Sequence, residues 1–502
     1  MADVIVIGAG LGGLAAAVEL AAAGRQVLVL EADSQVGGKA GVHTVDGVSF
    51  DTGPSVLTMP DVLGSLLGRA GMALGTDVVL RQPEPAFRYR WPDGATVDMH
   101  HDVGATLDDI GAALGADARR EMERFLDYSR SIWDAAAPRF VYGAAPTIGR
   151  VMAMGLGALA DLRHIDPLRS MDSGIARFVR TPRLVDILRR YATYNGSDPR
   201  RAPATLNCIA HVELALGGYG IEGGIHRVPA ALAEAAQRLG ARFRFQTPAR
   251  GVQLTDGRVA GVRTDDGVIP ADLVITNADA AQLTEELLPR GTRHGIPVNG
   301  TPSMSGWNTV YRAAFPTDGT TRPAHEVLFP QDYSAEFADI FDHDRPPREP
   351  TVYVCAQGTC HGRAHWGDAE PVFAMANAPA EPPDTARDPA VWTTLAQTVR
   401  DRLTGSGLLG PDDVPVWTRT PSELAVQFPG SRGAIYGLAS NDMTAAFRRP
   451  RNAAPAVPGL FLASGSAHPG GGMPMAMLSG IAAAEAAVGP DRPAVRGNSA
   501  AK

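Results

Sequence analysis

The most constraining feature of this 502-residue chain is a glycine turn between an apolar strand and a helix near residue 1. Residues 4–7 (VIVI) read as a buried strand, and the sequence GAGLGG follows over residues 8–13. A small-residue helix is predicted over residues 14–23, and a second apolar strand ends at Glu31. A strand, a glycine turn, a helix, a strand and an acid in this order are the context in which GxGxxG binds a dinucleotide.

Each glycine of this turn stands at a position where a side chain would interfere with the structure or with the ligand. Gly8 permits the tight turn, Gly10 lets the backbone approach a pyrophosphate, and Gly13 lets the helix pack closely on the strand. The N–H groups of the helix N-terminus would bind the pyrophosphate. Glu31 is placed to accept hydrogen bonds from a ribose diol, and its charge would repel a 2′-phosphate. The sequence therefore predicts a bound dinucleotide.

Two segments after Glu31 favour a flavin dinucleotide. The sequence VGGKA over residues 36–40 resembles the GG[R/K] signature of flavoproteins of the amine oxidase and carotenoid desaturase superfamily, although most members carry arginine where Lys39 stands. Its glycines would expose further N–H groups to the phosphates, and Lys39 would add a cation beside them. Gly53 and Pro54 match the segment that passes near the flavin ring in that family. Taken alone, either segment is equally compatible with a simple loop or turn.

The middle of the chain resembles bacterial phytoene and carotenoid desaturases. A tyrosine-rich segment ends in the sequence SDPRRAP at residues 197–203, and an apolar run containing His211, Val212 and Glu213 follows and is predicted as a strand. A glycine-rich loop over 217–224 then precedes a predicted helix over 228–238. Within the family, residues 192–219 are most similar to hydroxycarotenoid 3,4-desaturases.

The end of the chain resembles the same family. A predicted strand over 459–465 is followed by the sequence HPGGGMPMA at 468–476 and by a predicted helix over 477–488. In the family this helix N-terminus faces the pyrimidine side of the isoalloxazine, where it stabilises the charge of reduced flavin. The resemblance implies bound FAD. The cofactor-binding residues expected from motifs and resemblance together are Gly8, Ala9, Gly10, Leu11, Gly12, Gly13, Glu31, Ala32, Gly37, Gly38, Lys39, Gly53, Pro54, Val252, Gly465, Gly471, Gly472 and Met473.

The implied fold is α/β, with a Rossmann-type FAD-binding domain and a discontinuous α+β substrate domain. We assign residues 1–75, 210–285 and 419–488 to the FAD-binding domain. Residues 76–209 and 286–418 would form the substrate domain, which faces the membrane, and residues 489–502 a polar, disordered tail.

Composition excludes other classes of protein. The chain is 45% hydrophobic and has a net charge of -8, which argues against a nucleic-acid partner. Its three cysteines, Cys208, Cys355 and Cys360, form no CxxC pair, so we expect a reducing compartment and core thiols. No signal peptide is recognisable. The apolar run 151–160 is too short to cross a bilayer, so it is a core helix or a monotopic membrane contact. We expect a cytoplasmic protein, peripheral to the membrane.

The resemblance implies an FAD-dependent carotenoid desaturase, which removes a hydride and a proton from adjacent carbons of a long apolar isoprenoid such as phytoene, neurosporene or a hydroxylated derivative. A quinone or oxygen would reoxidise the flavin. The catalytic candidates are His468, an acid–base group or an anchor of its turn, and Glu213, a base or the buried partner of Arg227 or Arg201. No metal site is predicted, and the histidines at 361 and 365 are expected on a loop surface.

Two other functional classes stay open at this stage. One is an FAD-dependent oxidase or isomerase of another lipid or of an amine, with the same dinucleotide domain. Amine oxidation is disfavoured because no aromatic pair flanks the flavin segment and no cysteine lies near the C-terminal motif for covalent flavin. The other class is a flavin-binding protein without catalysis. The sequence leaves the oligomeric state undetermined.

Overall fold

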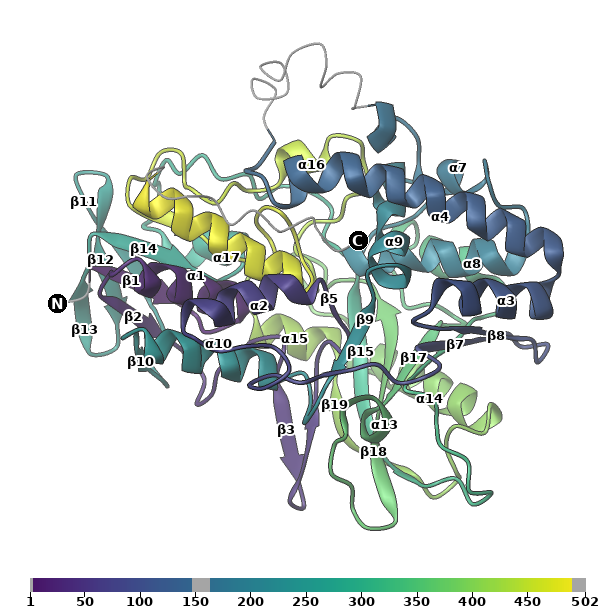
Figure 1. Ribbon diagram of the computed structural model, residues 1–502. Helices are drawn as coiled ribbons and strands as arrows, with labels where there is room; N and C mark the ends of the chain where they lie inside the picture. Colours follow the sequence, from purple (N-terminus) through teal and green to yellow (C-terminus); the bar gives the residue numbers. More distant parts are fainter. Residues whose placement is uncertain (1–2, 147–162, 490–502) are drawn as a thin grey trace.

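The computed structural model describes residues 3–146 and 163–489 (Figure 1). Its first layer is a parallel sheet with the strand order β10-β2-β1-β14-β20. Apart from the edge strand β10, whose sequence is RFR, the strands are fully or largely apolar, as befits a sheet covered on both faces. They come from three distant parts of the chain: β1 (Val4–Ile7), β2 (Val27–Leu30), β10 (Arg242–Arg244), β14 (Leu273–Thr276) and β20 (Leu460–Leu462).

Helices cover one face of this sheet, as Figure 1 shows at its left. Their small residues let them approach closely: a Cβ on Gly480 would lie 2.2 Å from the carbonyl oxygen of Gly12. The predicted helices are therefore confirmed, although the last one begins at Met473 rather than at residue 477. The covering helices are α1 (Leu11–Ala22), α2 (Pro60–Arg69), α10 (Arg227–Arg238) and α17 (Met473–Val488).

The opposite face of the parallel sheet packs on a small antiparallel sheet, β11-β12-β13. The hairpin predicted around residues 255–257 is its first pair of strands. The elements on this side are β11 (Gly251–Thr255), β12 (Arg258–Thr264), β13 (Gly267–Pro270), α11 (Ala280–Gln282) and the π-helical turn η5 (Leu283–Leu287).

A second large sheet has the order β19-β15-β18-β17-β16-β7-β8 and is antiparallel except where β16 pairs with β7. The hairpin predicted around the sequence WPDG at 91–94 joins β7 and β8. Its strands are β7 (Phe87–Arg90), β8 (Thr96–Met99), β15 (Ser305–Ala314), β16 (His325–Leu328), β17 (Val352–Ala356), β18 (Ala369–Ala378) and β19 (Val414–Arg419).

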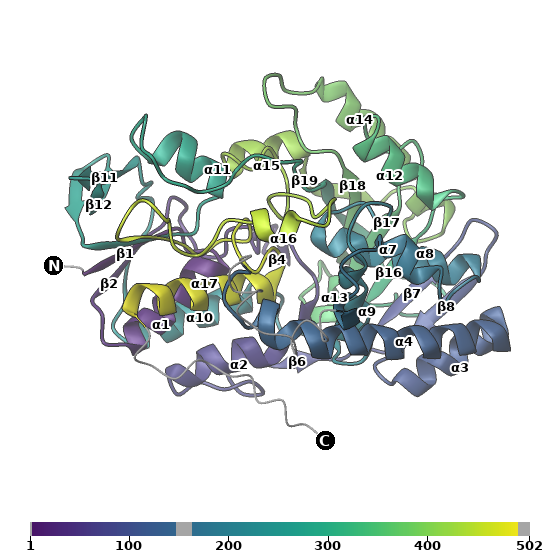
Figure 2. The same ribbon diagram turned by 90° about the horizontal axis from the view of Figure 1, so that it is seen from above.

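Helices flank this second sheet on both sides. Figure 2 shows α3 and α4 along one side and α12 and α14 along the other. Aromatic residues of β7 and α12 share one core with α4 and α8, whereas α14 packs on β15, β17 and β18. The bounds are α3 (Val103–Leu114), α4 (Ala116–Ala136), α7 (Met171–Ile175), α8 (Pro182–Arg190), α9 (Cys208–Leu214), α12 (Tyr333–Phe341) and α14 (Pro389–Gly405), with short turns η1 (Ala137–Val141), η2 (Arg163–Ile165), η3 (Tyr191–Asn195) and η4 (Ala204–Asn207).

The strand predicted around His211 and Glu213 is wrong, because these residues lie in helix α9. A short apolar run has no periodicity that separates a buried strand from a buried helix. Packing decides the outcome here: α9 lies against α4, and Ala210 and Leu214, four residues apart on one helical face, enter the aromatic core.

Short elements connect the two large sheets. Strand β9 lies in the glycine-rich loop after α9 and pairs with both β5 and β6. These elements are β3 (Val42–Val45), β4 (Val48–Asp51), β5 (Leu57–Thr58), β6 (Leu80–Arg81), β9 (Gly218–Ile221), α13 (Gln357–His361), α15 (Pro421–Gln427) and α16 (Ala445–Arg448).

Two sequence expectations fall outside the described residues. The apolar run 151–160 is one, and the C-terminal tail, apart from Gly489, is the other. Within 3–146 and 163–489, no helix combines the length and the apolar character that crossing a bilayer requires.

Candidate active site

The two N-terminal glycine segments meet in space. Gly10 and Gly37 form a parallel bridge, and the Gly37 N–H donates to the carbonyl of Ala9 at 2.9 Å. A Cβ on Gly38 would lie 3.3 Å from the Cα of Gly10, so a larger residue would crowd the contact. The GxGxxG turn and the GGK segment therefore form one wall of a single site.

Asn277, which the sequence analysis did not single out, holds this wall in place. Its Oδ1 accepts a hydrogen bond from the Gly10 N–H at 3.1 Å, and its Nδ2 donates to the carbonyl of Ala463. A Cβ on Gly10 would come within 2.4 Å of that Oδ1. The missing side chain at Gly10 thus makes room for Asn277. The sequence contained one signal for this role: Asn277 is a polar residue directly after the strand β14. Ligands bind at the carboxyl ends of parallel strands.

The Glu31 carboxylate also binds the turn. Its Oε2 accepts from the Ala9 N–H at 2.5 Å, and its Oε1 accepts from the Asp33 N–H at 2.9 Å. Burial raises the pKa of Glu31, and the backbone hydrogen bonds oppose that rise. The sequence predicted that Glu31 accepts hydrogen bonds from a ribose diol. In this structure its carboxylate binds the backbone N–H groups of Ala9 and Asp33.

A second glycine turn opposes the first. A Cβ on Gly465 would lie 3.4 Å from the Cα of Gly471, so this turn is also closely packed. Helices α1 and α17, both within the described chain, have Gly10 and Gly472 as their N-cap residues and carry neither a side-chain cap nor an acidic residue in the first turn. Helix N-termini carry unpaired N–H groups and partial positive charge. Two such ends facing one cavity fit FAD, which has an anionic pyrophosphate and a ring that acquires negative charge on reduction.

The cavity has a volume of about 1380 Å³, which exceeds the roughly 300–1,000 Å³ of a typical ligand site. It therefore has room for a dinucleotide and a second molecule. Ala9, Gly13 and Val252 lie behind the described cavity wall: a Cβ on Gly13 would lie 2.1 Å from the Gly8 carbonyl oxygen, and Val252 is buried in β11. The expected cofactor residues that line the cavity are Gly8, Gly10, Leu11, Gly12, Glu31, Ala32, Gly37, Gly38, Lys39, Gly53, Pro54, Gly465, Gly471, Gly472 and Met473.

The Lys39 ammonium group is bound to a neighbouring loop. Its Nζ donates to the carbonyls of Ala434 and Ile435 at 3.0 and 2.9 Å. Burial lowers the pKa of Lys39 to about 8, although the Asp279 charge acts in the opposite direction. Lys39 thus joins the GGK segment to the loop over 428–437. With a pKa of about 8, its amine loses its proton just above neutral pH.

Glu213 has a different partner from those expected. Its carboxylate accepts hydrogen bonds from Tyr194 and, at 3.0 Å, from Tyr191, and it lies 3.9 Å from the Arg190 guanidinium. The two arginines considered from the sequence have other partners. Arg201 forms an ion pair with Asp342, directly after α12, and Arg227 donates to the backbone carbonyl of Asp77. The described cavity wall includes Arg190 and Tyr194 but not Glu213. These contacts fit a structural partner of Arg190.

Arg190 supplies a cationic, polar end to the cavity. Its guanidinium donates to the Tyr89 hydroxyl at 3.1 Å and lies 5.2–5.9 Å from four aromatic ring centres. The rings are those of Phe87, Tyr89, Tyr194 and Tyr353. Aromatic faces stabilise a desolvated cation. Asn308 and Asn377 are further polar residues in the cavity wall.

His468 lines the cavity beside the α17 turn and is 4% exposed. Its Nε2 lies 2.9 Å from the carbonyl oxygen of Gly143. A carbonyl only accepts, so this nitrogen carries the proton. The bond ties the C-terminal turn to the segment after α4, and the acid–base role of His468 stays a prediction.

The prediction that His361 and His365 both lie on a loop surface is only half right. His365 is exposed as predicted, but His361 is fully buried at the end of α13. The structure also brings His325, Cys355 and Cys360 together, with one ligand atom of each within 4.8 Å of the others. Sequence spacing did not reveal this cluster, because it forms through the pairing of β16 with β17 and the turn into α13. The expectation that the protein binds no metal stays a prediction.

The parallel sheet, its paired glycine turns and the two helix ends facing one cavity define an FAD-dependent oxidoreductase. The chain belongs to the flavin containing amine oxidoreductase family, whose sequence profile matches residues 11–488.

Individual relatives span almost the whole chain. The chain is 36% identical to a hydroxyneurosporene desaturase of Cereibacter sphaeroides, over 96% of this chain and 97% of the relative. It is 31% identical to a 4,4'-diapolycopene oxygenase of Methylomonas sp, over 95% and 96%. Among solved structures, an oxidoreductase from Methanosarcina mazei is similar with a TM-score of 0.62 and 16% identity, over 95% of this chain and 98% of that one. The last likeness shows a shared fold.

A prediction follows from the lowered pKa of Lys39. Its amine is largely protonated at about pH 7 and largely neutral at about pH 9, whereas an anionic cofactor favours the protonated form. Binding at the higher pH must therefore take up a proton, and we expect FAD to bind flavin-stripped protein about tenfold more weakly there. Fluorescence titration measures the affinities. Lys39→Met should show a nearly flat profile, and an equal pH dependence in both proteins would contradict the assignment.

A second prediction concerns Glu213. Glu213→Ala leaves the buried Arg190 charge without its carboxylate, so we expect a loss of about 3–5 kcal/mol in the free energy of unfolding, measured with denaturant. Glu213→Gln keeps an oxygen acceptor for Tyr191 and should lose less stability. If Glu213→Gln were as stable as the parent protein but inactive, Glu213 would be a catalytic base and the structural role would be wrong.

Proposed function

We propose that this protein is an FAD-dependent desaturase of a long polyene, and that a hydroxylated carotenoid is its substrate. The supporting observation is the single cavity that runs from the glycine turns to the polar end around Arg190. The names of the relatives point the same way, since the hydroxyneurosporene desaturase covers nearly the whole chain.

The cavity suits an elongated apolar molecule with one polar end. Apolar and aromatic side chains contribute much of the cavity wall, among them Trp133, Phe140, Ile209, Phe373 and Met375. Such a wall excludes water and binds a polyene through burial of apolar surface. In the proposed complex, Arg190, Asn308 and Tyr194 hydrogen-bond the hydroxyl group and so orient the chain.

When bound, FAD supplies the acceptor for the hydride that leaves the substrate. The N-terminus of α17 would stabilise negative charge on the reduced ring, because it presents unpaired N–H groups. His468 lines the cavity beside that helix end, and we propose that it accepts or positions the proton released from the adjacent carbon. The hydrogen bond from its Nε2 to the Gly143 carbonyl holds the imidazole ring in place for either role.

The cavity mouth supports a membrane-facing orientation. Leu168 and Val426 line the cavity and are 79% and 81% exposed, and Met443 and Phe447 of the same wall are also exposed. Exposed apolar side chains around an opening mark a contact with lipid or protein. A carotenoid substrate and a quinone acceptor both dissolve in a bilayer, so a docked mouth would supply both. Oxygen is the alternative acceptor.

The direct test of the reaction supplies FAD-loaded protein with phytoene, neurosporene or 1-hydroxyneurosporene. We expect the hydroxylated substrate to react best and to gain one conjugated double bond, seen as a red-shifted absorbance and a mass lower by two hydrogens. Gly10→Val is the control: its side chain would collide with Asn277, so it should lose flavin and activity. Parallel reactions with a quinone under nitrogen, or with oxygen alone, identify the acceptor. Three unchanged pigments would refute the proposal, and added oxygen mass would indicate an oxygenase.

Membrane docking is tested by flotation with phosphatidylcholine vesicles. The double variant Leu168→Glu and Phe447→Glu places two charges at the cavity mouth, and we expect it to lose most vesicle binding. Val268→Glu is the matched control, because Val268 is 52% exposed on β13, on the opposite side of the parallel sheet from α17. Equal flotation of all three proteins would contradict docking through the mouth.

A further inference from the structure

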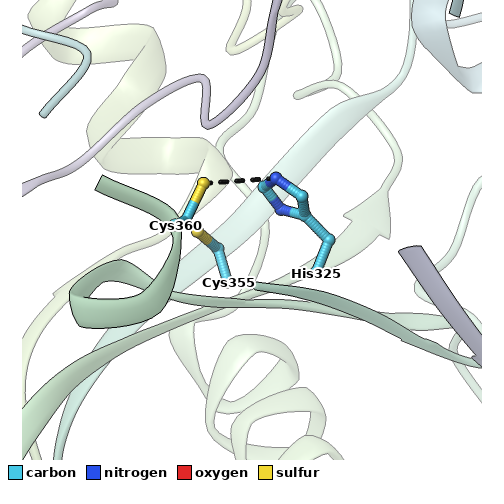
Figure 3. Close-up of side chains that lie close together, drawn as sticks. All are labelled: His325, Cys355 and Cys360. Carbon is cyan, nitrogen blue, oxygen red and sulfur yellow. Dashed lines mark hydrogen bonds between the residues drawn. The ribbon is translucent and has the colours of Figure 1, made fainter. Parts of the chain in front are cut away.

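A cluster of soft ligand atoms lies buried beside the second sheet, apart from the proposed chemistry. His325, Cys355 and Cys360 point toward one another (Figure 3) and are 4%, 0% and 0% exposed. One ligand atom of each lies within 4.8 Å of the others, and the His325 Nε2 is 3.3 Å from the Cys360 Sγ. The structure has all three cysteines as free thiols.

Backbone pairing creates this cluster. His325 of β16 and Cys355 of β17 are direct partners in the antiparallel register, so their side chains leave the same face of the sheet. Helix α13 begins directly after β17 and turns Cys360 back over that pair. Three ligands therefore come from one strand–strand–helix unit, which fixes their relative positions before any ion binds.

Two further side chains orient the ligands. The Tyr353 hydroxyl is 2.7 Å from the His325 Nδ1, which leaves the Nε2 directed at the sulfur atoms. His361 Nδ1 accepts from the Ile221 N–H at 3.1 Å, so a neutral His361 carries its proton on Nε2, 4.0 Å from the Cys355 Sγ. Metal-ligating residues commonly have such outer hydrogen-bond partners.

We propose that His325, Cys355 and Cys360 bind one thiophilic divalent cation of the zinc class, through the imidazole Nε2 and the two sulfur atoms. Zinc bonds of about 2.0 Å to nitrogen and 2.3 Å to sulfur at tetrahedral angles place ligand atoms roughly 3.5–3.8 Å apart. The distance of 3.3 Å and the limit of 4.8 Å bracket that spacing. Binding releases the thiol protons, and a water molecule would complete the fourth position.

The position of α13 gives the ion a structural role. Gln357 of α13 exchanges two hydrogen bonds with the backbone of Asp51, at 2.8 and 2.9 Å. The Asp51 carboxylate accepts from the N–H groups of Ile225 and His226, just before α10. An ion that holds α13 to β16 and β17 thus stabilises the junction between the second sheet and the dinucleotide-binding layer. It also fixes Tyr353, whose ring lines the substrate cavity.

The test titrates Co²⁺ into FAD-loaded protein that has been reduced with a phosphine and dialysed against a chelator. We expect one equivalent to bind with ligand-field bands at longer wavelengths than flavin absorption, Zn²⁺ to displace it, and the thermal midpoint to rise in its presence. A wild-type protein without these bands overturns the proposal. So does a Cys355–Cys360 disulfide that resists the reductant, detected by mass.

Variants assign the ligands. Cys355→Ser, Cys360→Ser and His325→Gln should each bind Co²⁺ at least tenfold more weakly, whereas Cys208→Ser on α9 should bind as the parent protein does. Retained flavin shows that a variant is folded, and at least one ligand variant must pass this check for the comparison. If folded Cys360→Ser keeps full binding, or if Cys208→Ser loses as much as Cys360→Ser, the ion binds elsewhere and the proposal is wrong.

Discussion

One side chain, Asn277, links the three stretches of sequence that build the dinucleotide site. It follows β14, accepts from the Gly10 N–H and donates to the Ala463 carbonyl after β20. The absence of side chains at Gly10 and Gly12 lets it reach both, since a Cβ on either would lie within 2.9 Å of its amide. Together with the pairing of β1, β14 and β20, this amide holds the strand ends beside the cavity that the N-termini of α1 and α17 line. Helix N-termini carry partial positive charge, so they favour an anionic ligand there.

A different constraint applies to Arg190, a cavity-lining residue whose positive charge is buried among aromatic side chains. Arg190 is surrounded by aromatic rings and balanced by Glu213, whose remaining lone pairs accept from two tyrosines. Such a cluster is stable only when each polar group has a partner. The cavity is therefore lined both by the glycine turns expected to bind the cofactor and by the polar group around Arg190, for which we propose contact with the substrate.

Helix α13 joins the two large sheets. The exchange between Gln357 and Asp51 is buried, and the Arg363 guanidinium forms an ion pair with the Asp51 carboxylate at 2.7 Å. The proposed ion beside it would strengthen the same junction. Buried polar contacts around Asp51 thus join the second sheet to the segment before α10 in the dinucleotide-binding layer.

The sequence by itself determined the dinucleotide turn, the two strands around it and the helix after Gly472, because these depend on short-range patterns of glycine and apolar residues. The hairpin around residues 91–94 was also readable for this reason. The helical state of α9 was not, since its short apolar run fits a strand equally well until α4 packs on it. The role of Asn277 was also invisible, because its partners lie more than 180 residues away.

Tertiary structure alone decided the partner of Glu213 and the meeting of His325 with Cys355 and Cys360. Neither follows from spacing along the chain, because Arg190 reaches Glu213 from a different helix and the ligand cluster exists only in the β16–β17 register. A shift of that register by one residue would turn His325 to the other face of the sheet. Local sequence therefore specified the elements and the cofactor turn, whereas long-range strand pairing and burial specified which polar groups face one another.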